Sequence, residues 1–371
     1  MPGRTPHHRR WLATCAVLLA VHWTAGAQAP VPPRPDAAVL VDVESAFARI
    51  AGEGEHLTAS VDGHIPKGSY RQKLTNLFGL HNHFQGIQRV PDTDYFVVSG
   101  SNPNMSELFI VRLATGDRVS ETSIPPANGI VARIGIDPVM WHAGGLSLEG
   151  TILAVPLYGG TPRRGTIAFY DLRDPEKPEK LPVEIDRLGR KSMAVALTRL
   201  PGGHYLAAVL GGYDGLPRRV EFYLSQTDRL EDGFRAPSVT LRFSEVQARP
   251  GQDRTFSHFQ NVNFIRQADN RLYLVGFHNK SFFQSRMFGS DYADLYEVVF
   301  PRDTIDAPVP RLVRPAIVKA GSRSLNCTDG FCNLDAAAGL YVDPASQSMS
   351  VYAAPGWLAG DRMKFTVYGG K

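Results

Sequence analysis

A seven-residue fragment occurs twice in this chain. Residues 82–88 read Asn-His-Phe-Gln-Gly-Ile-Gln, and residues 257–263 read Ser-His-Phe-Gln-Asn-Val-Asn. A turn and then a β-rich run follow each copy. A fragment that returns after a long interval indicates one structural unit used several times, and such a repeat constrains the fold more than any single motif does.

Five segments share one order of elements. Each has a first strand, a polar turn, an apolar second strand, a loop and a third strand of alternating polarity. The first strands are expected at 84–90, 144–148, 193–200, 259–266 and 337–342. A fourth strand is expected in three units, at 180–185, 238–243 and 311–318. Helical periodicity is confined to 42–51, where Val43, Phe47 and Ile50 share a face.

Four antiparallel strands per unit, repeated around an axis, form a β-propeller blade. Phe169–Pro178 reads Phe-Tyr-Asp-Leu-Arg-Asp-Pro-Glu-Lys-Pro, which resembles the strand and turn of many secreted propeller repeats. The resemblance to the β-propeller superfamily covers residues 80–371 and implies an all-β fold with five four-stranded blades. A ring of six blades that uses 129–136 or 57–61 is the alternative. No Trp-Asp dipeptide, kelch motif or NHL-type signature singles out a family.

The fifth unit reaches the end of the chain without a fourth strand. The run 38–43 is apolar and rich in β-branched residues, so we expect it to supply that strand and close the ring. An unpaired blade edge would otherwise invite aggregation. The predicted organisation is therefore a leader at 1–27, an N-terminal segment with the ring-closing strand at 28–79, and the propeller at 80–371.

The first residues have the three parts of a secretory signal peptide. Arg4, Arg9 and Arg10 form a positive region, Leu12–Val21 is a short apolar run, and Ala25-Gly26-Ala27 is a small-residue cleavage site. Cleavage after Ala27 would place the mature protein in the periplasm or outside the cell. No other stretch approaches the ~18 apolar residues of a transmembrane helix, so no transmembrane segment is expected.

Cysteine usage and charge agree with export. Cys327 and Cys332 remain after cleavage and are expected to form a disulfide in an oxidising compartment. The formal net charge is +4, and the three arginines of residues 1–27, where no acid occurs, account for most of it. A nearly neutral mature surface argues against a nucleic-acid partner. A small molecule, a glycan or an envelope protein remains as the expected partner.

Polar side chains cluster near the starts of the first strands. The first strands of a propeller line its channel and run the same way, so their starts gather on one face. We therefore expect one ligand-binding site at the channel mouth, formed by His83, Gln85, His142, His258, Gln260 and Asp335.

Three interpretations of the histidines stay open. His83, His142 and His258 could hold a divalent metal ion, with Asp335 completing the ligand set. They could bind an organic ligand, or they could cap the strands by hydrogen bonding to loops. The fold does not decide between them.

The predicted function is an exported propeller with a polar, histidine-containing site. The alternative is a metal-dependent hydrolase, lyase or oxidoreductase that uses the same histidines. A glycosidase needs two facing carboxylates and fits less well. Asp335 starts a strand, whereas Glu149 lies in a turn.

Overall fold

The structure is a computed structural model that describes most of the chain after the predicted leader. Its described residues are 38–61, 63–66, 69–70, 82–113, 128–159, 164–187, 189–211, 218–236, 238–279, 291–302, 304–305, 307, 310–327 and 332–369. The leader lies outside these ranges, so the signal peptide and the site of cleavage stay predictions. No helix within the described ranges is long and apolar enough to cross a membrane.

The fold is almost entirely β: the described strands form a six-stranded, a five-stranded and a four-stranded sheet, and eight further strands form one closed series. Two single parallel pairs, Ala338 with Gly86 and Ser60 with Gly129, divide that series into two antiparallel groups of four strands. We number these two groups and the three other sheets as sheets 1 to 5 along the chain. Sheet 1 contains β3 His83–Arg89, β4 Tyr95–Asn102, β5 Met105–Arg112 and β6 Gly129–Asp137. Sheet 2 contains β7 His142–Ala143, β8 Ser147–Glu149, β9 Ile152–Gly159, β10 Arg164–Asp171 and β11 Glu179–Asp186. Sheet 3 contains β12 Ala194–Arg199, β13 Tyr205–Gly211, β14 Arg219–Leu224 and β15 Val239–Arg242.

The last two sheets each recruit strands from elsewhere in the sequence. Sheet 4 contains β17 Asn261–Gln267, β18 Leu272–Asn279, β19 Asp291–Val299 and β20 Ala316–Leu325, with β1 Val39–Leu40 and β16 Gln247–Ala248 added at its edges. Sheet 5 contains β21 Ala337–Asp343, β22 Ser348–Ala354, β23 Arg362–Gly369 and β2 Glu55–Ser60. Three short helices complete the described elements, α1 Val43–Ala48, η2 Leu230–Asp232 and η3 Phe243–Glu245.

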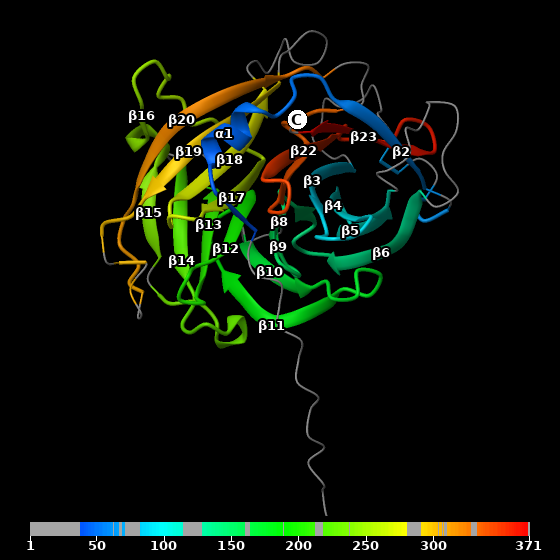
Figure 1. Ribbon diagram of the computed structural model, residues 1–371. Coiled ribbons are helices and arrows are strands. Elements are labelled where there is room, and N and C mark those ends of the chain that lie inside the picture. The colour runs from blue at the N-terminus through cyan, green and yellow to red at the C-terminus, as the bar shows by residue number, and fades with distance from the viewer. Residues whose placement is uncertain are drawn as a thin grey trace, which may run out of the picture. The chain divides into compact units, whose positions relative to one another are not determined.

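Each pair of successive sheets shares a hydrophobic core, and the pairs form a closed cycle. On β9, Ile152 packs toward sheet 3 while its neighbour Leu153 packs toward sheet 1, because successive side chains of a strand point to opposite faces. The cycle closes where Phe365 of sheet 5 shares a core with Phe84 of sheet 1. Figure 1 shows the sheets following one another around a common centre, with β3, β8, β12 and β17 innermost. This is the β-propeller arrangement that the sequence predicts.

The ring closes with a different strand from the one predicted. β2 pairs antiparallel with β23, from Glu55 opposite Val367 to Ser60 opposite Arg362. The prediction that 38–43 would be this strand was wrong. That run divides into β1, which pairs parallel with β17, and the start of α1, where the Asp42 carboxylate accepts a hydrogen bond from the Ser45 N–H. The helix predicted within 42–51 is confirmed.

The segments required by the six-unit alternative belong to sheets already counted. Residues 129–136 fall in β6, which pairs with β5 of sheet 1. Residues 57–60 fall in β2 of sheet 5. The two segments also pair with each other, through Ser60 and Gly129, and the number of blades stays a prediction.

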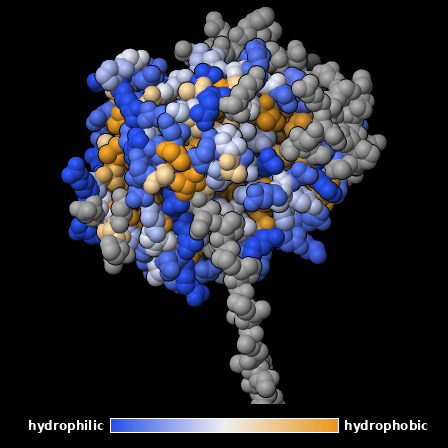
Figure 2. Space-filling view, viewed as in Figure 1, coloured by the Kyte–Doolittle hydropathy of each residue, from blue (hydrophilic) through white to orange (hydrophobic). Residues whose placement is uncertain are grey.

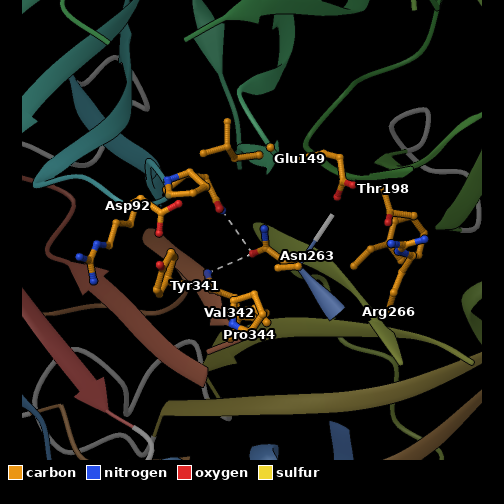
Figure 3. A pocket seen from close by; sticks show the side chains of 16 residues that line it. Asp92, Glu149, Thr198, Asn263, Arg266, Tyr341, Val342 and Pro344 are labelled. Carbon is orange, nitrogen blue, oxygen red and sulfur yellow. Dashed lines mark hydrogen bonds between the residues drawn. The ribbon is translucent and has the colours of Figure 1, made fainter. Parts of the chain in front are cut away.

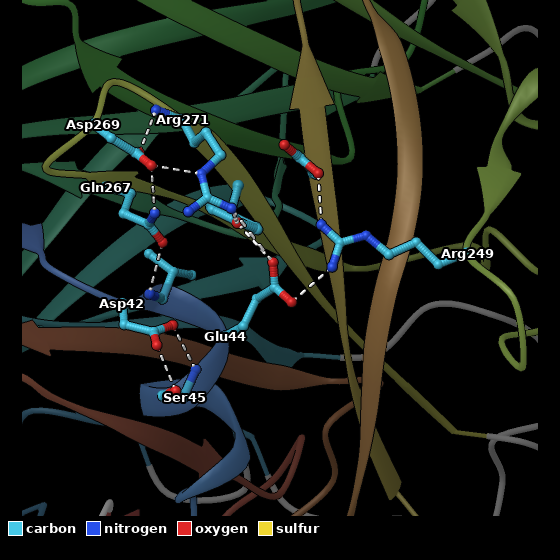
Figure 4. A network of polar contacts seen from close by, with 10 residues as sticks. Asp42, Glu44, Ser45, Arg249, Gln267, Asp269 and Arg271 are labelled. Carbon is cyan, nitrogen blue, oxygen red and sulfur yellow. Dashed lines mark hydrogen bonds and ion pairs between the residues drawn. The ribbon is translucent and has the colours of Figure 1, made fainter.

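Polar contacts fix α1 against sheet 4 (Figure 4). Glu44 accepts hydrogen bonds from Arg249 at 2.7 Å and from the Tyr273 hydroxyl at 2.8 Å. The Val43 N–H donates to Gln267 Oε1 at 3.0 Å. Because Arg249 also binds Glu297 at 2.6 Å, the helix is joined to β19 as well. The connection between β1 and β2 is therefore held on the sheet that precedes the closing one.

The predicted disulfide between Cys327 and Cys332 is present, with the two Cα atoms 5.6 Å apart. Cys332 packs in the core shared by sheets 4 and 5, and its sulfur contacts the Tyr368 hydroxyl at 3.3 Å. The bridge thus holds the connection between the last two sheets near the start of β21. Figure 2 shows that hydrophilic residues cover most of the coloured surface on the viewed face, with hydrophobic residues in small groups.

Candidate functional site

The first strands touch one another close to their starts, and glycine permits this. A Cβ atom at Gly86 would lie 2.5 Å from the Leu146 nitrogen, and one at Gly145 would lie 2.0 Å from the Gln260 carbonyl oxygen. Only residues without a side chain allow backbones to come so close. Residues that precede this contact in the sequence of each unit lie toward one end of the channel, which we call the histidine mouth after His83, His142 and His258. Residues that follow the contact along the first strands lie toward the opposite end.

The structure brings two predicted histidines together at this mouth. The rings of His83 and His142 have centroids 4.9 Å apart, and Tyr158 at the end of β9 lies 4.1 Å from His142. His142 is buried, and its Nε2 atom has no hydrogen-bond partner among the described residues. Burial, with smaller contributions from His83 and Lys191, lowers the pKa of His142 well below its usual value. The imidazole is therefore neutral at physiological pH.

The third predicted histidine contacts a different neighbour. His258 Nε2 lies 3.1 Å from the Met193 sulfur, just before the first strand of sheet 3. Burial, together with the charges of Arg218 and Lys191, lowers the pKa of His258 to about 4. His258 is therefore neutral as well, and it connects the starts of sheets 3 and 4.

The two predicted glutamines lie at the contact between the first strands. Gln85 is buried, and its Oε1 atom has no partner among the described residues. The Asn261 side chain donates to the carbonyl oxygens of Gln85 at 2.9 Å and Ala336 at 3.0 Å, while its own Oδ1 atom is buried and unpartnered. Gln260 is half-buried and presents its backbone carbonyl to Gly145.

Asp335 has a second carboxylate nearby. Burial raises the pKa of Asp335 to about 6, against an opposing effect of His278. Burial, and then repulsion by Asp335, raises the pKa of Asp291 to about 7. Both carboxyl groups therefore titrate near neutral pH.

Sequence analysis did not include Asp291 in the site, because it considered only the starts of the first strands. In an antiparallel sheet the third strand begins at the same edge as the first. Asp291 begins β19 and pairs with Asn279 at the end of β18. This rule of antiparallel order is the signal that would have found it.

The described residues contain no group of three or more His, Cys, Asp or Glu side chains that could hold a metal ion. The metal assignment stays a sequence-based prediction, and no step below uses it.

The raised pKa of Asp291 predicts a pH-dependent effect of Asp291→Asn. A carboxyl group whose folded pKa is raised stabilises the fold below its unfolded pKa, and that contribution is lost as pH rises through the folded value. The variant cannot ionise, so it should match the parent near pH 4. At pH 8 it should be more stable, by on the order of 2–4 kcal/mol. Thermal melts at pH 4, 6 and 8 measure the difference.

Asp294→Asn is the matched control with the opposite sign. Burial raises the pKa of Asp294, but the hydrogen bond and charge of His278 outweigh it and the net pKa is lowered. This carboxylate binds His278 Nε2 and Lys319 Nζ, each at 3.0 Å. Asp294→Asn should therefore destabilise the protein most at high pH. Equal effects of the two substitutions across the pH range would contradict the assignment.

Comparisons with known proteins give weak likenesses. No family model matches the chain, and no curated protein matches it. A Penicillium chrysogenum α-L-arabinanase complexed with arabinobiose has 13% identity and a TM-score of 0.36, over 90% of this chain and 98% of that one. A fructosyltransferase from A. japonicus has 10% identity and a TM-score of 0.38, over 86% and 56%. The polysaccharide lyase Uly1 has 9% identity and a TM-score of 0.32, over 91% and 98%. Likenesses of this size say nothing about the reaction.

Proposed function

We propose that this protein is an exported five-bladed propeller, with each sheet as one blade, that binds a polar small molecule or a glycan at the histidine mouth. The observation that carries the proposal is that three buried polar atoms in and around the starts of the first strands have no hydrogen-bond partner among the described residues. They are His142 Nε2, Gln85 Oε1 and Asn261 Oδ1. A buried polar atom left unpaired costs ~1–3 kcal/mol, and a bound ligand relieves that cost by hydrogen bonding.

The chemistry of the mouth suits a hydroxyl-bearing ligand. The neutral ring of His142 lies beside the rings of His83 and Tyr158, and the Lys191 ammonium lies 5.7 Å from the centre of the Tyr158 ring. Aromatic surface with a few convergent polar groups is typical of small-molecule sites. Neutral imidazoles both donate and accept hydrogen bonds, which matches the two roles of a sugar hydroxyl.

A second candidate function is acid–base catalysis at the same end of the channel. Asp291 and Asp335 have raised pKa values of about 7 and about 6, and pairs of this kind concentrate at active sites. At neutral pH such a pair supplies both a proton donor and a proton acceptor. Cleavage of a glycosidic bond between two carboxylates is the reaction class that this pair favours.

His142→Phe tests ligand binding at the histidine mouth. The substitution keeps an aromatic ring and removes both ring nitrogens, so it should weaken binding of a responsive oligosaccharide at least tenfold, the effect of losing a hydrogen bond worth ~1.4 kcal/mol. A glycan panel identifies the responsive probe, and calorimetric titration measures its affinity. Asp335→Asn should abolish cleavage of the same probe if the second function holds, while leaving binding within a few-fold.

His204→Phe is the matched control. His204 is also buried, but it lies before β13 and its Nδ1 contacts the Ser225 carbonyl at 3.2 Å. It should reduce stability and leave the affinity unchanged. If His142→Phe binds the probe as tightly as the parent, or if no glycan in the panel binds the parent, the proposed function is wrong.

A further inference from the structure

A separate pocket lies beyond the contact between the first strands, at the end opposite to the histidine mouth. Its volume is about 140 Å³, and all five sheets contribute to its lining. Its polar lining includes Gln88, Glu149, Thr198, Asn263, Arg266 and Tyr341. Figure 3 shows Glu149, Thr198, Asn263 and Tyr341 on different strands around the pocket. Along the first strands, Gln88 and Glu149 follow the close backbone contact at Gly86 and Gly145, whereas His83 and His142 precede it.

Glu149 presents an unused acceptor in this pocket. The Thr198 hydroxyl and the Arg199 N–H hydrogen-bond to its carboxylate, and both lie on β12 of the neighbouring sheet. Its Oε1 atom is buried and has no partner among the described residues. The carboxylate is thus fixed in place with one oxygen left for another molecule.

Asn263 is also held in place by hydrogen bonds, and it presents a donor to the pocket. Its Oδ1 atom accepts hydrogen bonds from Gln88 Nε2 at 3.3 Å and from the Leu340 N–H at 3.2 Å. Both bonds are drawn in Figure 3, where the amide nitrogen points away from them. Gln88, Thr198 and Asn263 are each at most 4% exposed, so these groups are rigidly held rather than solvated surface. The pocket therefore offers a fixed acceptor and a fixed donor.

The charged side chains around the pocket are of both signs. Arg89, Arg266 and Asp92 line it, and burial raises the pKa of Glu149 to about 7 against the opposing effect of the Arg266 charge, so Glu149 is only partly ionised at neutral pH. The Arg89 guanidinium already lies 4.7 Å above the Tyr341 ring and donates to the Tyr352 hydroxyl at 3.3 Å. The Arg266 charge acts on Glu149, and Arg89 is engaged by two tyrosines, so the lining presents no excess of either charge to a ligand and favours a neutral one.

We propose that this pocket binds a neutral, hydroxyl-rich small molecule, a monosaccharide or a polyol. A hydroxyl group both donates and accepts, so it can hydrogen-bond to Glu149 in either protonation state and accept from the Asn263 amide. The volume lies below the ~300 Å³ at which pockets for drug-sized ligands begin, so it accommodates one small molecule and no extended chain. This site is independent of the one at the histidine mouth.

The Asn263 side-chain amide gives a local readout in nitrogen-edited NMR. Asn263→Asp keeps the acceptor that Gln88 and Leu340 use and replaces the amide nitrogen, so the signal lost in this variant is that of Asn263. Glucose and xylitol are the neutral probes, glucuronate is the anion and glucosamine is the cation. The neutral probes should shift the Asn263 signal with saturation at concentrations up to about 100 mM, as expected for a small ligand.

Glu149→Gln and Thr198→Val should each raise the concentration needed for half-saturation at least tenfold. His142→Phe, at the other mouth, should leave it unchanged. If none of the four probes shifts the signal, the pocket holds solvent only and the proposal fails. A charged probe that saturates at lower concentration than glucose and xylitol overturns the ligand class. Unchanged half-saturation in both pocket variants overturns the site, provided that thermal melts show them folded.

Discussion

Replacing Ala59 with Asp is expected to unfold most of the protein at room temperature. Ala59 is fully buried on β2 and packs in the core that joins the last sheet to the first. A carboxylate there has no partner, and burying an unpaired charge costs several kcal/mol. Since a domain is stable by only ~5–15 kcal/mol, the substitution removes a large share of that margin. Urea denaturation followed by circular dichroism measures the loss.

A double-mutant cycle shows whether the loss comes from ring closure. Leu57 of β2 is paired with Phe365 of β23, and both side chains are buried. Leu57→Ala and Phe365→Ala should be coupled by ~0.5–3 kcal/mol, as residues in direct contact are. Glu55→Ala, on the exposed end of the same strand, is the control and should change stability by less than ~0.5 kcal/mol. Additive effects of the two core substitutions would mean that β2 does not pair with β23 in solution.

The repeated strand pattern was readable from the sequence because it depends on local alternation. Ile152 and Leu153 pack in different cores because successive side chains of a strand point to opposite faces. The closing strand was harder to place, since β2 and its partner β23 are separated by about three hundred residues. Nothing local distinguishes Glu55–Ser60 from the competing run at 38–43, and the Asp42 cap that diverts that run into α1 acts only once a helix forms.

For the candidate sites, too, features that follow from the order of strands could be predicted, and features that depend on contacts between sheets could not. His83 and His142 were predicted to meet because first strands start on one face, and their ring contact follows from that order. Glu149 was interpreted as a turn residue, and its burial depends on the neighbouring β12, which the sequence of sheet 2 does not contain. The fourth strand of sheet 4 was expected at 311–318 and spans Ala316–Leu325, because pairing with β19 extends it. Contacts between units, rather than patterns within them, account for what the sequence analysis missed.

Arg187→Met is expected to destabilise the protein by about 3–5 kcal/mol, the usual cost of leaving one member of a buried ion pair alone. The side chains of Arg187 and Glu221 are both fully buried, with Arg187 Nη2 3.1 Å from Glu221 Oε2. Arg187 also donates to the Lys191 carbonyl at 2.5 Å, and Lys191 is the residue whose ammonium lies over Tyr158 at the histidine mouth. The variant should therefore weaken ligand binding as well as stability.

The pH dependence of this loss identifies its cause. Burial raises the pKa of Glu221, but the Arg187 charge and the hydrogen bond from Tyr223 outweigh it, so the net pKa is lowered. A lowered folded pKa adds stability above the unfolded pKa, and this is lost as pH falls. Without Arg187 the buried carboxylate keeps only the Arg190 charge and the Tyr223 hydrogen bond, so the deficit relative to the parent should be largest near pH 7 and smallest near pH 4. Denaturant titrations at both pH values measure it.

Two comparisons separate a lost ion pair from a lost packing contact. The double variant Arg187→Met/Glu221→Leu removes both charges, and it should recover most of the stability, because apolar residues of similar volume often replace a buried pair at little cost. Lys180→Ala, which breaks the exposed pair between Lys180 and Glu184 on β11, should cost less than ~1 kcal/mol. A double variant as unstable as Arg187→Met would show that shape, and not the unpaired carboxylate, explains the effect. In that case the link between sheets 2 and 3 would depend on packing of the arginine stem, and the deficit would not change with pH.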